Sequence, residues 1–79
     1  MEEYVFTFGC GQVLEGFYVR IKGKSFDDCR KTMLEIFDTE WAFQYSLEDW
    51  NNWTKEAKKL GIPLEEELIC LENKEEAVI

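Results

Sequence analysis

The chain has 79 residues, which allows one domain with one small core, and it carries six Phe, three Tyr and three Trp. Its formal net charge of −8 argues against non-specific binding to nucleic acid, because neutralisation of phosphate drives that binding. There is no histidine, and Cys10, Cys29 and Cys70 lie far apart, which argues against a zinc site. Free thiols, with no signal peptide and no long apolar run, predict a soluble, cytoplasmic protein.

Two strands are expected at about residues 3–8 and 17–22, joined by a loop that contains three glycines. Side chains alternate between the two faces of a strand, so each of these segments has one apolar face. The inward-facing side chains are predicted to be Tyr4, Phe6, Phe8, Phe17, Val19 and Ile21.

Two helices are expected, and each begins after a serine. Ser25 and Ser46 are both followed by acidic residues, which the positive N-terminal end of a helix favours. The first helix is predicted to end near Asp38 and the second at Gly61. The predicted apolar stripes are Phe26, Cys29, Met33, Ile36 and Phe37 in the first helix, and Leu47, Trp50, Trp53, Ala57 and Leu60 in the second.

A third strand is expected at Trp41–Tyr45 and a short fourth strand at Glu67–Leu71, so the order of elements is ββαβαβ. All connections are short, which favours a single α+β domain over residues 1–79. We expect a small, mainly antiparallel four-stranded sheet with both helices on one face, and a frayed tail from about 72 to 79.

No catalytic constellation is found in the sequence. Gly23-Lys24-Ser25 precedes a helix, but Tyr18 stands where a phosphate-binding loop needs another glycine. Without histidine, no local motif supplies a base for a serine or cysteine nucleophile. Acidic pairs such as Asp27 and Asp28 are explained by helix capping. We therefore expect a non-enzymatic protein without a metal or cofactor.

The alternating aromatic segments Tyr4–Gln12 and Trp41–Tyr45 each carry a glutamine. Such an amide can hydrogen-bond the edge of a planar ligand while an aromatic ring stacks on its face. Nearby glycines would let backbone amides approach the ligand, and an arginine would face its phosphate. Alternatively, both amides cap backbone groups of a loop or sheet edge. The candidate ligand-binding residues are Gly9, Gly11, Gln12, Arg20, Trp41, Gln44 and Tyr45.

The first 50 residues resemble a group of small proteins encoded by phages and prophages of Firmicutes-type bacteria. The resemblance lies in an FxFGxGQ-like string at Phe6–Gln12, the segment Gly16–Ile21, Arg30 and Met33, and a WxFQY-like string at Trp41–Tyr45. It implies an accessory phage protein that counters host defence. It transfers no catalytic residue, and Cys10 stands where the resemblance implies a bulkier side chain.

The leading hypothesis is a homo-oligomeric counter-defence protein that sequesters a small nucleotide-like signalling ligand. The alternative is an acidic inhibitor of a host defence nuclease, similar to an anti-CRISPR protein, that mimics nucleic acid. Its acidic half contains Glu65, Glu66, Glu67, Glu72, Glu75 and Glu76. A phage accessory module with a different partner is a third possibility. Neither direct binding to nucleic acid nor contact with a membrane is expected.

Overall fold

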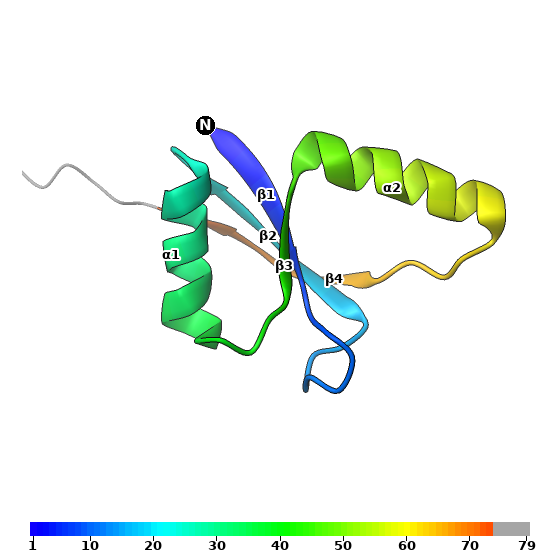
Figure 1. The fold of residues 1–79 in the computed structure, drawn as a ribbon. Coiled ribbons are helices and arrows are strands. Elements are labelled where there is room, and N and C mark those ends of the chain that lie inside the picture. The colour runs from blue at the N-terminus through cyan, green and yellow to red at the C-terminus, as the bar shows by residue number, and fades with distance from the viewer. Residues whose placement is uncertain (74–79) are drawn as a thin grey trace, which may run out of the picture.

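Four strands and two helices follow one another along residues 1–73, the part of the chain that the computed structural model describes (Figure 1). The elements are β1 (Glu2–Thr7), β2 (Phe17–Gly23), α1 (Phe26–Phe37), β3 (Phe43–Ser46), α2 (Leu47–Leu60) and β4 (Glu66–Glu72). The predicted α+β class, the four-stranded sheet and the order ββαβαβ are confirmed.

β1 is an inner strand of the sheet, whose order is β3-β1-β2-β4. It pairs antiparallel with β2 on one side and with β3 on the other, so that Phe6 lies opposite both Val19 and Gln44. β4 pairs with β2 in parallel. The sheet is therefore mainly antiparallel, as predicted, with one parallel edge strand.

One face of the sheet forms the main core under α1. Its buried side chains are Phe6, Phe8, Val19, Ile21, Cys29 and Met33. Ser25 accepts a hydrogen bond from the backbone of Asp28, which fixes the start of α1. A Cβ atom at Gly23 would lie 2.8 Å from the sulfur of Cys29, so the glycine allows α1 to pack closely against β2.

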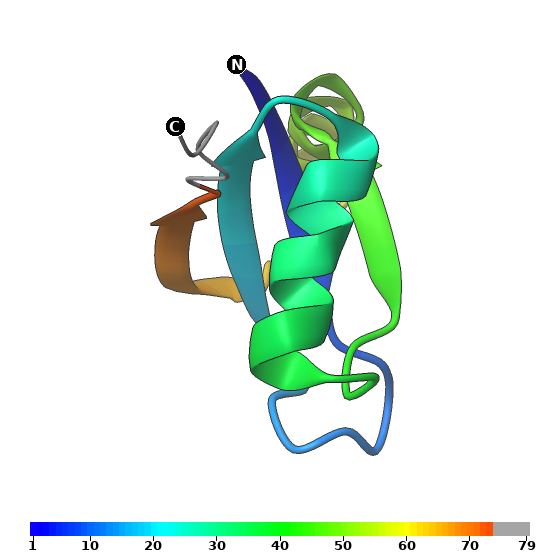
Figure 2. The same ribbon diagram turned by 90° about the vertical axis from the view of Figure 1, so that its left-hand side faces the viewer.

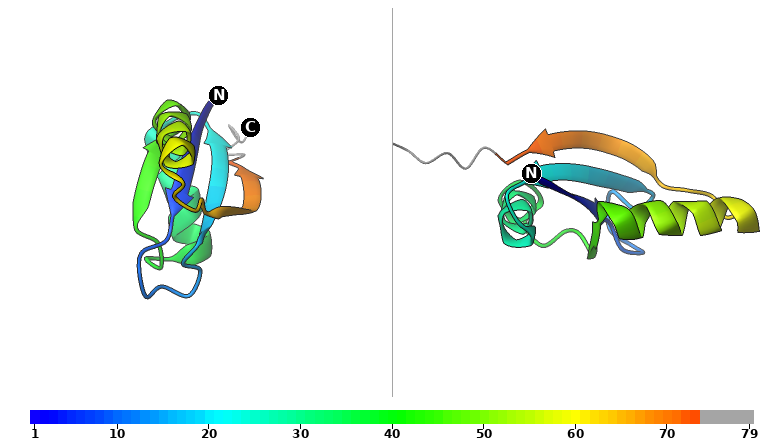
Figure 3. Two further views of the ribbon diagram at one scale, coloured as in Figure 1. Left: turned by 90° about the vertical axis from the view of Figure 1, so that its right-hand side faces the viewer. Right: turned by 90° about the horizontal axis from the view of Figure 1, so that it is seen from above.

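The expectation that both helices cover one face of the sheet is wrong. α1 covers the face of Phe6 and Val19, whereas α2 lies on the opposite face, as the two side views show (Figures 2 and 3). β2, β3 and β4 are parallel to one another, and the β2–β3 and β3–β4 crossovers run in opposite directions across the sheet. Because such crossovers are almost always right-handed, opposite directions place the helices on opposite faces.

α2 is anchored on its own face by Trp50, whose ring lies 4.9 Å from that of Tyr18 and 5.9 Å from that of Tyr45. Beyond this contact the helix projects past the sheet (Figure 1). Trp50 and Ala57 are buried, but Trp53 is 41% exposed and Leu60 is 69% exposed. The predicted apolar stripe of α2 is therefore only partly used in the fold.

Two further sequence expectations need correction. In α1, Ile36 is 52% exposed, although its spacing predicted a core position. Glu72 belongs to β4, and the Asn73 side chain donates to the backbone oxygen of Asp28 at 2.9 Å and to the hydroxyl of Thr32. These contacts fasten the end of β4 to α1, so the predicted fraying does not begin at residue 72. Residues 74–79 lie outside the described part.

Within residues 1–73, neither helix has the length and apolar character required to span a bilayer.

Trp50 holds α2 on the sheet, which leads to a first prediction. Trp50→Ala should lower the free energy of unfolding by about 3–5 kcal/mol, because it removes a buried indole between two tyrosines. The matched control is Trp53→Ala on the same helix, where we expect a loss of about 1 kcal/mol or less. Urea denaturation followed by circular dichroism measures both. Equal losses would contradict this placement of α2.

Candidate functional site

Gln12 closes the loop between β1 and β2 on itself. Its side-chain oxygen accepts a hydrogen bond from the backbone of Gly9, and its backbone N–H donates to the oxygen of Gly9 at 3.0 Å. Gly11 adopts a φ of 88°, which favours glycine, and its N–H donates to the Glu15 carboxylate at 3.2 Å. Gly9 and Gln12 thus satisfy one another, and Glu15 satisfies the N–H of Gly11, as in the capping alternative.

Gln44 lies in β3 on the α1 side of the sheet. Its side-chain nitrogen donates to the backbone oxygen of Phe26, the first residue of α1, at 3.0 Å. Its side-chain oxygen is buried and has no hydrogen-bond partner within residues 1–73. The amide therefore caps a backbone group with one end and keeps one unpaired acceptor at the other.

Trp41 packs its ring against the core. It meets Phe6 edge to face at 5.2 Å between ring centroids, and its indole nitrogen donates to the backbone oxygen of Asp38 at 2.9 Å. The guanidinium of Arg30 lies 5.0 Å from the centre of the same ring. Both the nitrogen and a ring face are thus occupied by protein groups, which leaves less of the indole for a stacked base.

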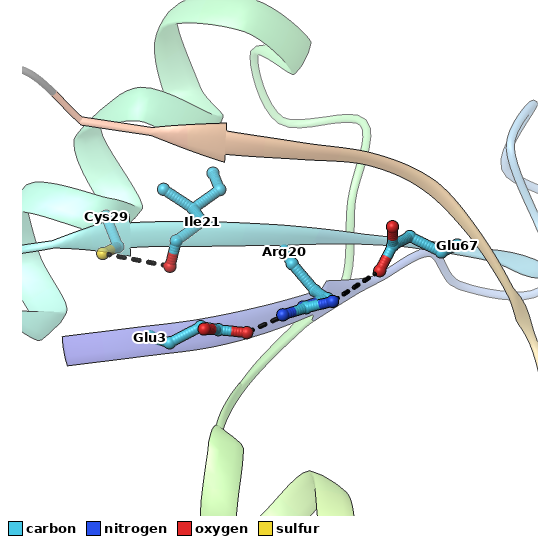
Figure 4. A network of polar contacts seen from close by, with 5 residues as sticks. All are labelled: Glu3, Arg20, Ile21, Cys29 and Glu67. Atoms are coloured by element: carbon cyan, nitrogen blue, oxygen red, sulfur yellow. Dashed lines mark hydrogen bonds and ion pairs between the residues drawn. The ribbon is translucent and has the colours of Figure 1, made fainter.

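Arg20 bridges two carboxylates on the α2 face of the sheet (Figure 4). Its guanidinium lies 2.7 Å from Glu3 and 3.0 Å from Glu67. These hydrogen bonds, first that with Glu3 and then that with Glu67, raise the pKa of Arg20 above its already high ordinary value. Arg20 therefore fastens β1, β2 and β4 to one another, and its positive charge is paired with two carboxylates of the protein.

Tyr45 belongs to the aromatic cluster that anchors α2. It lies opposite Val5 in the sheet register and packs beside Phe43 and Trp50. Gln44 and Tyr45 are neighbours in one strand, so their side chains point to opposite faces. Tyr45 and Gln44 thus cannot contact the same small ligand from one side of the sheet.

The seven predicted ligand-binding residues therefore fall into three separate places. Gly9, Gly11 and Gln12 are in the β1–β2 loop, Trp41 and Gln44 are on the α1 side, and Arg20 and Tyr45 are on the α2 side. The structure does not bring them together as one site.

The sequence interpretation missed the partners of Arg20 and the significance of the β4 edge. The side chain of Glu3 points to the opposite face from that of Tyr4. In the hairpin register Val5 lies opposite Arg20 and Glu3 lies opposite Lys22, so Glu3 is a diagonal neighbour of Arg20 on the same face. That pairing is the signal that could have identified Glu3. Glu67 belongs to an acidic run, and its contact with Arg20 depends on the parallel β2–β4 pairing, for which no local signal exists.

Exposed carboxylates gather along β4, the open edge of the sheet. Glu66, Glu67 and Glu72 are exposed on this strand, and the N–H of Glu66 donates to the oxygen of Gly16 at 3.0 Å. Within residues 1–73, no group of histidine, cysteine, aspartate or glutamate side chains is arranged to hold a metal ion. We take this acidic edge as the candidate functional surface.

The cysteines show little of the chemistry that a thiol nucleophile needs. Cys29 is buried, its sulfur lies 3.6 Å from the backbone oxygen of Ile21, and burial raises the pKa of its thiol to about 11 (Figure 4). At neutral pH this thiol is protonated and packed in the core. Cys10 and Cys70 are exposed and free.

No protein-family model, curated protein or solved structure matches this chain.

The loop cap leads to a second prediction. Gln12→Ala should lower the free energy of unfolding by about 1 kcal/mol, because the N–H of Gly9 loses its side-chain acceptor. Val13→Ala is the matched control, since Val13 lies in the same loop and its side chain is almost fully exposed. Thermal unfolding by circular dichroism measures both. An unchanged stability for Gln12→Ala would show that the amide is free for another role.

Proposed function

We propose that this chain is a non-enzymatic, protein-binding inhibitor whose acidic β4 edge occupies a basic surface of a host defence nuclease. The observation that carries the proposal is the place of the glutamates. They lie along an ordered, open strand of the sheet, where a partner can reach them together. A fixed array of carboxylates on a rigid element is a better mimic of nucleic-acid phosphates than a flexible tail.

Part of the acidic edge is held in place by the fold. Arg20 fixes the Glu67 carboxylate by a bond of 3.0 Å, and Asn73 fastens the end of the strand to α1. Glu66 is tied through its backbone to Gly16. Binding to a basic partner would then cost little ordering entropy at these positions, which favours affinity.

The third prediction tests this proposal with purified, DNA-cleaving defence nucleases, including a Cas9-type effector with its guide. We expect the protein to slow DNA cleavage by at least one of them at about 50 mM salt, and much less at about 500 mM, because screening weakens the charge contacts. The variant Glu65→Gln with Glu66→Gln, at the residue before β4 and at the first residue of β4, should inhibit about tenfold less, while it keeps the Arg20–Glu67 pair.

The matched control for that variant is Glu35→Gln with Glu40→Gln, which changes the net charge equally at exposed positions outside β4. It should inhibit like the unchanged protein. The proposal would be contradicted if both double variants inhibited every nuclease equally. It would also be contradicted if the unchanged protein inhibited none of them.

Sequestration of a small nucleotide-like ligand is a second candidate, which one observation favours. The side-chain oxygen of Gln44 is buried without a partner within residues 1–73, and a ligand donor would satisfy it. Trp41 and Gln44 share the α1 side of the sheet, so they are the pair that such a ligand would contact.

The fourth prediction follows from this second candidate. Purified protein denatured by heat should release a small molecule that mass spectrometry identifies, and Gln44→Ala should bind that molecule with a loss of about 1–3 kcal/mol. Gln12→Ala is the control, because the structure places Gln12 in a different part of the molecule. A preparation that releases no small molecule, together with a Gln44→Ala variant that changes only the melting temperature, would exclude the ligand.

A further inference from the structure

The two edges of the sheet differ in how open they are. β3, at one edge, has four residues and leads directly into α2. β4, at the other edge, has seven residues and contains neither proline nor lysine, two of the means by which natural proteins block strand addition. A register shift near Tyr18 and Val19 disturbs only the first part of β4, so its regular part runs from Ile69 to Glu72.

The backbone of this regular part presents, to the side away from β2, hydrogen-bonding groups that no other residue of 1–73 pairs with. The N–H of Asn73 donates to the oxygen of Lys22 at 2.7 Å, so Asn73 turns its N–H toward β2. Alternate residues of a strand turn their backbone groups the same way, so Leu71 and Ile69 also face β2. Cys70 and Glu72 therefore turn their N–H and C=O groups to the open side.

The side chains of β4 divide into an acidic face and an apolar face. Glu67, Cys70 and Glu72 lie opposite Tyr18, Arg20 and Lys22 in the register and so share the α2 face of the sheet. Leu71 lies opposite Ile21 and packs against the main core. Arg20 and Lys22 offset part of the acidic charge, but they stand one strand inward, and the glutamates stand at the edge itself.

We propose that the β4 edge binds an extended, basic segment of the partner protein by strand addition, with backbone hydrogen bonds to Cys70 and Glu72. This inference rests on the proposed function and specifies how the partner is held. Basic side chains at alternate positions would meet Glu67 and Glu72, and apolar side chains between them would extend the face of Leu71. Backbone pairing supplies affinity, and this alternation supplies selectivity.

Charge distinguishes this occupant from a second copy of the chain. Each copy carries a net charge of −8. Its β4 has Glu66 and Glu67 at one end and Glu72 at the other. Pairing two copies of β4 would bring these glutamates together, and like charges across a strand pair destabilise it. A basic segment turns the same charges into attraction.

The probe is a capped octapeptide of alternating lysine and valine, titrated into the isotopically labelled full chain and followed by NMR. We expect the amide signals of Cys70 and Glu72 to shift most and their hydrogen exchange to slow, because these N–H groups gain acceptors. A peptide of the same sequence with an N-methyl group on every backbone nitrogen has equal charge but cannot pair as a strand. The methylated peptide should bind at least about tenfold more weakly than the unmethylated one.

The variant pair is Cys70→Pro and Cys70→Ala. Proline removes the outward N–H and keeps the bonds to β2, so we expect a folded chain that binds the lysine–valine peptide about tenfold more weakly. Cys70→Ala keeps the N–H and should bind unchanged. If Cys70→Pro fails to fold, Glu72→Pro at the end of β4 takes its place, with Glu72→Gln as its control.

Equal binding of the methylated peptide, or equal binding by Cys70→Pro and Cys70→Ala, overturns strand addition. A dimer in sedimentation equilibrium that Cys70→Pro converts to a monomer also overturns it, because a second copy then fills the edge. The cleavage assay distinguishes this failure from that of the proposed function. Inhibition that is lost with Glu65→Gln and Glu66→Gln but kept by Cys70→Pro means that the acidic surface acts without backbone pairing.

Discussion

The structure depends on one strand that is buried on both of its faces. In β1 and the residue after it, Val5, Phe6, Thr7 and Phe8 are all buried. Side chains alternate along a strand, so Phe6 and Phe8 require cover on one face, and Val5 and Thr7 require it on the other. A sheet with both helices on one side would leave Val5 and Thr7 in water. The sequence of β1 therefore demands a helix on each face, and the crossover directions supply them.

Local patterns in the sequence were enough for the elements and for the main core. The serine caps at Ser25 and Ser46 mark both helix starts, and the alternation of Tyr4, Phe6 and Phe8 identifies the face that packs on α1. The placement of α2 was missed because Trp50 and Trp53 look alike in sequence. Only contact with Tyr18 and Tyr45, from two other strands, separates the buried indole from the exposed one.

The candidate site was harder to predict, for a physical reason. A glutamine beside an aromatic strand has the same local sequence whether it reads a ligand or caps a backbone group. The partners of Gln12 and Gln44 are backbone atoms three and eighteen residues away, and the second of these depends on how α1 lies over β3. In the same way, the parallel pairing of β2 with β4 creates both the Arg20–Glu67 contact and the open edge. It joins two strands between which α1, β3 and α2 lie in the sequence.

The charges on β4 bear both on which chains can pair with the open edge and on which partner the edge would bind. An open strand edge invites pairing with any extended chain, and the acidic residues on β4 would repel the β4 strand of a second copy brought against it. The same repulsion applies to other acidic chains and to nucleic acid itself. The occupant that we propose is a basic, extended segment, and basic side chains are also what a nuclease uses to bind the phosphates of its substrate. Arg20 contributes from within the sheet, because it holds Glu67 in place without neutralising Glu72. Under the proposed function, the same few side chains would disfavour pairing with a second copy and favour a basic partner.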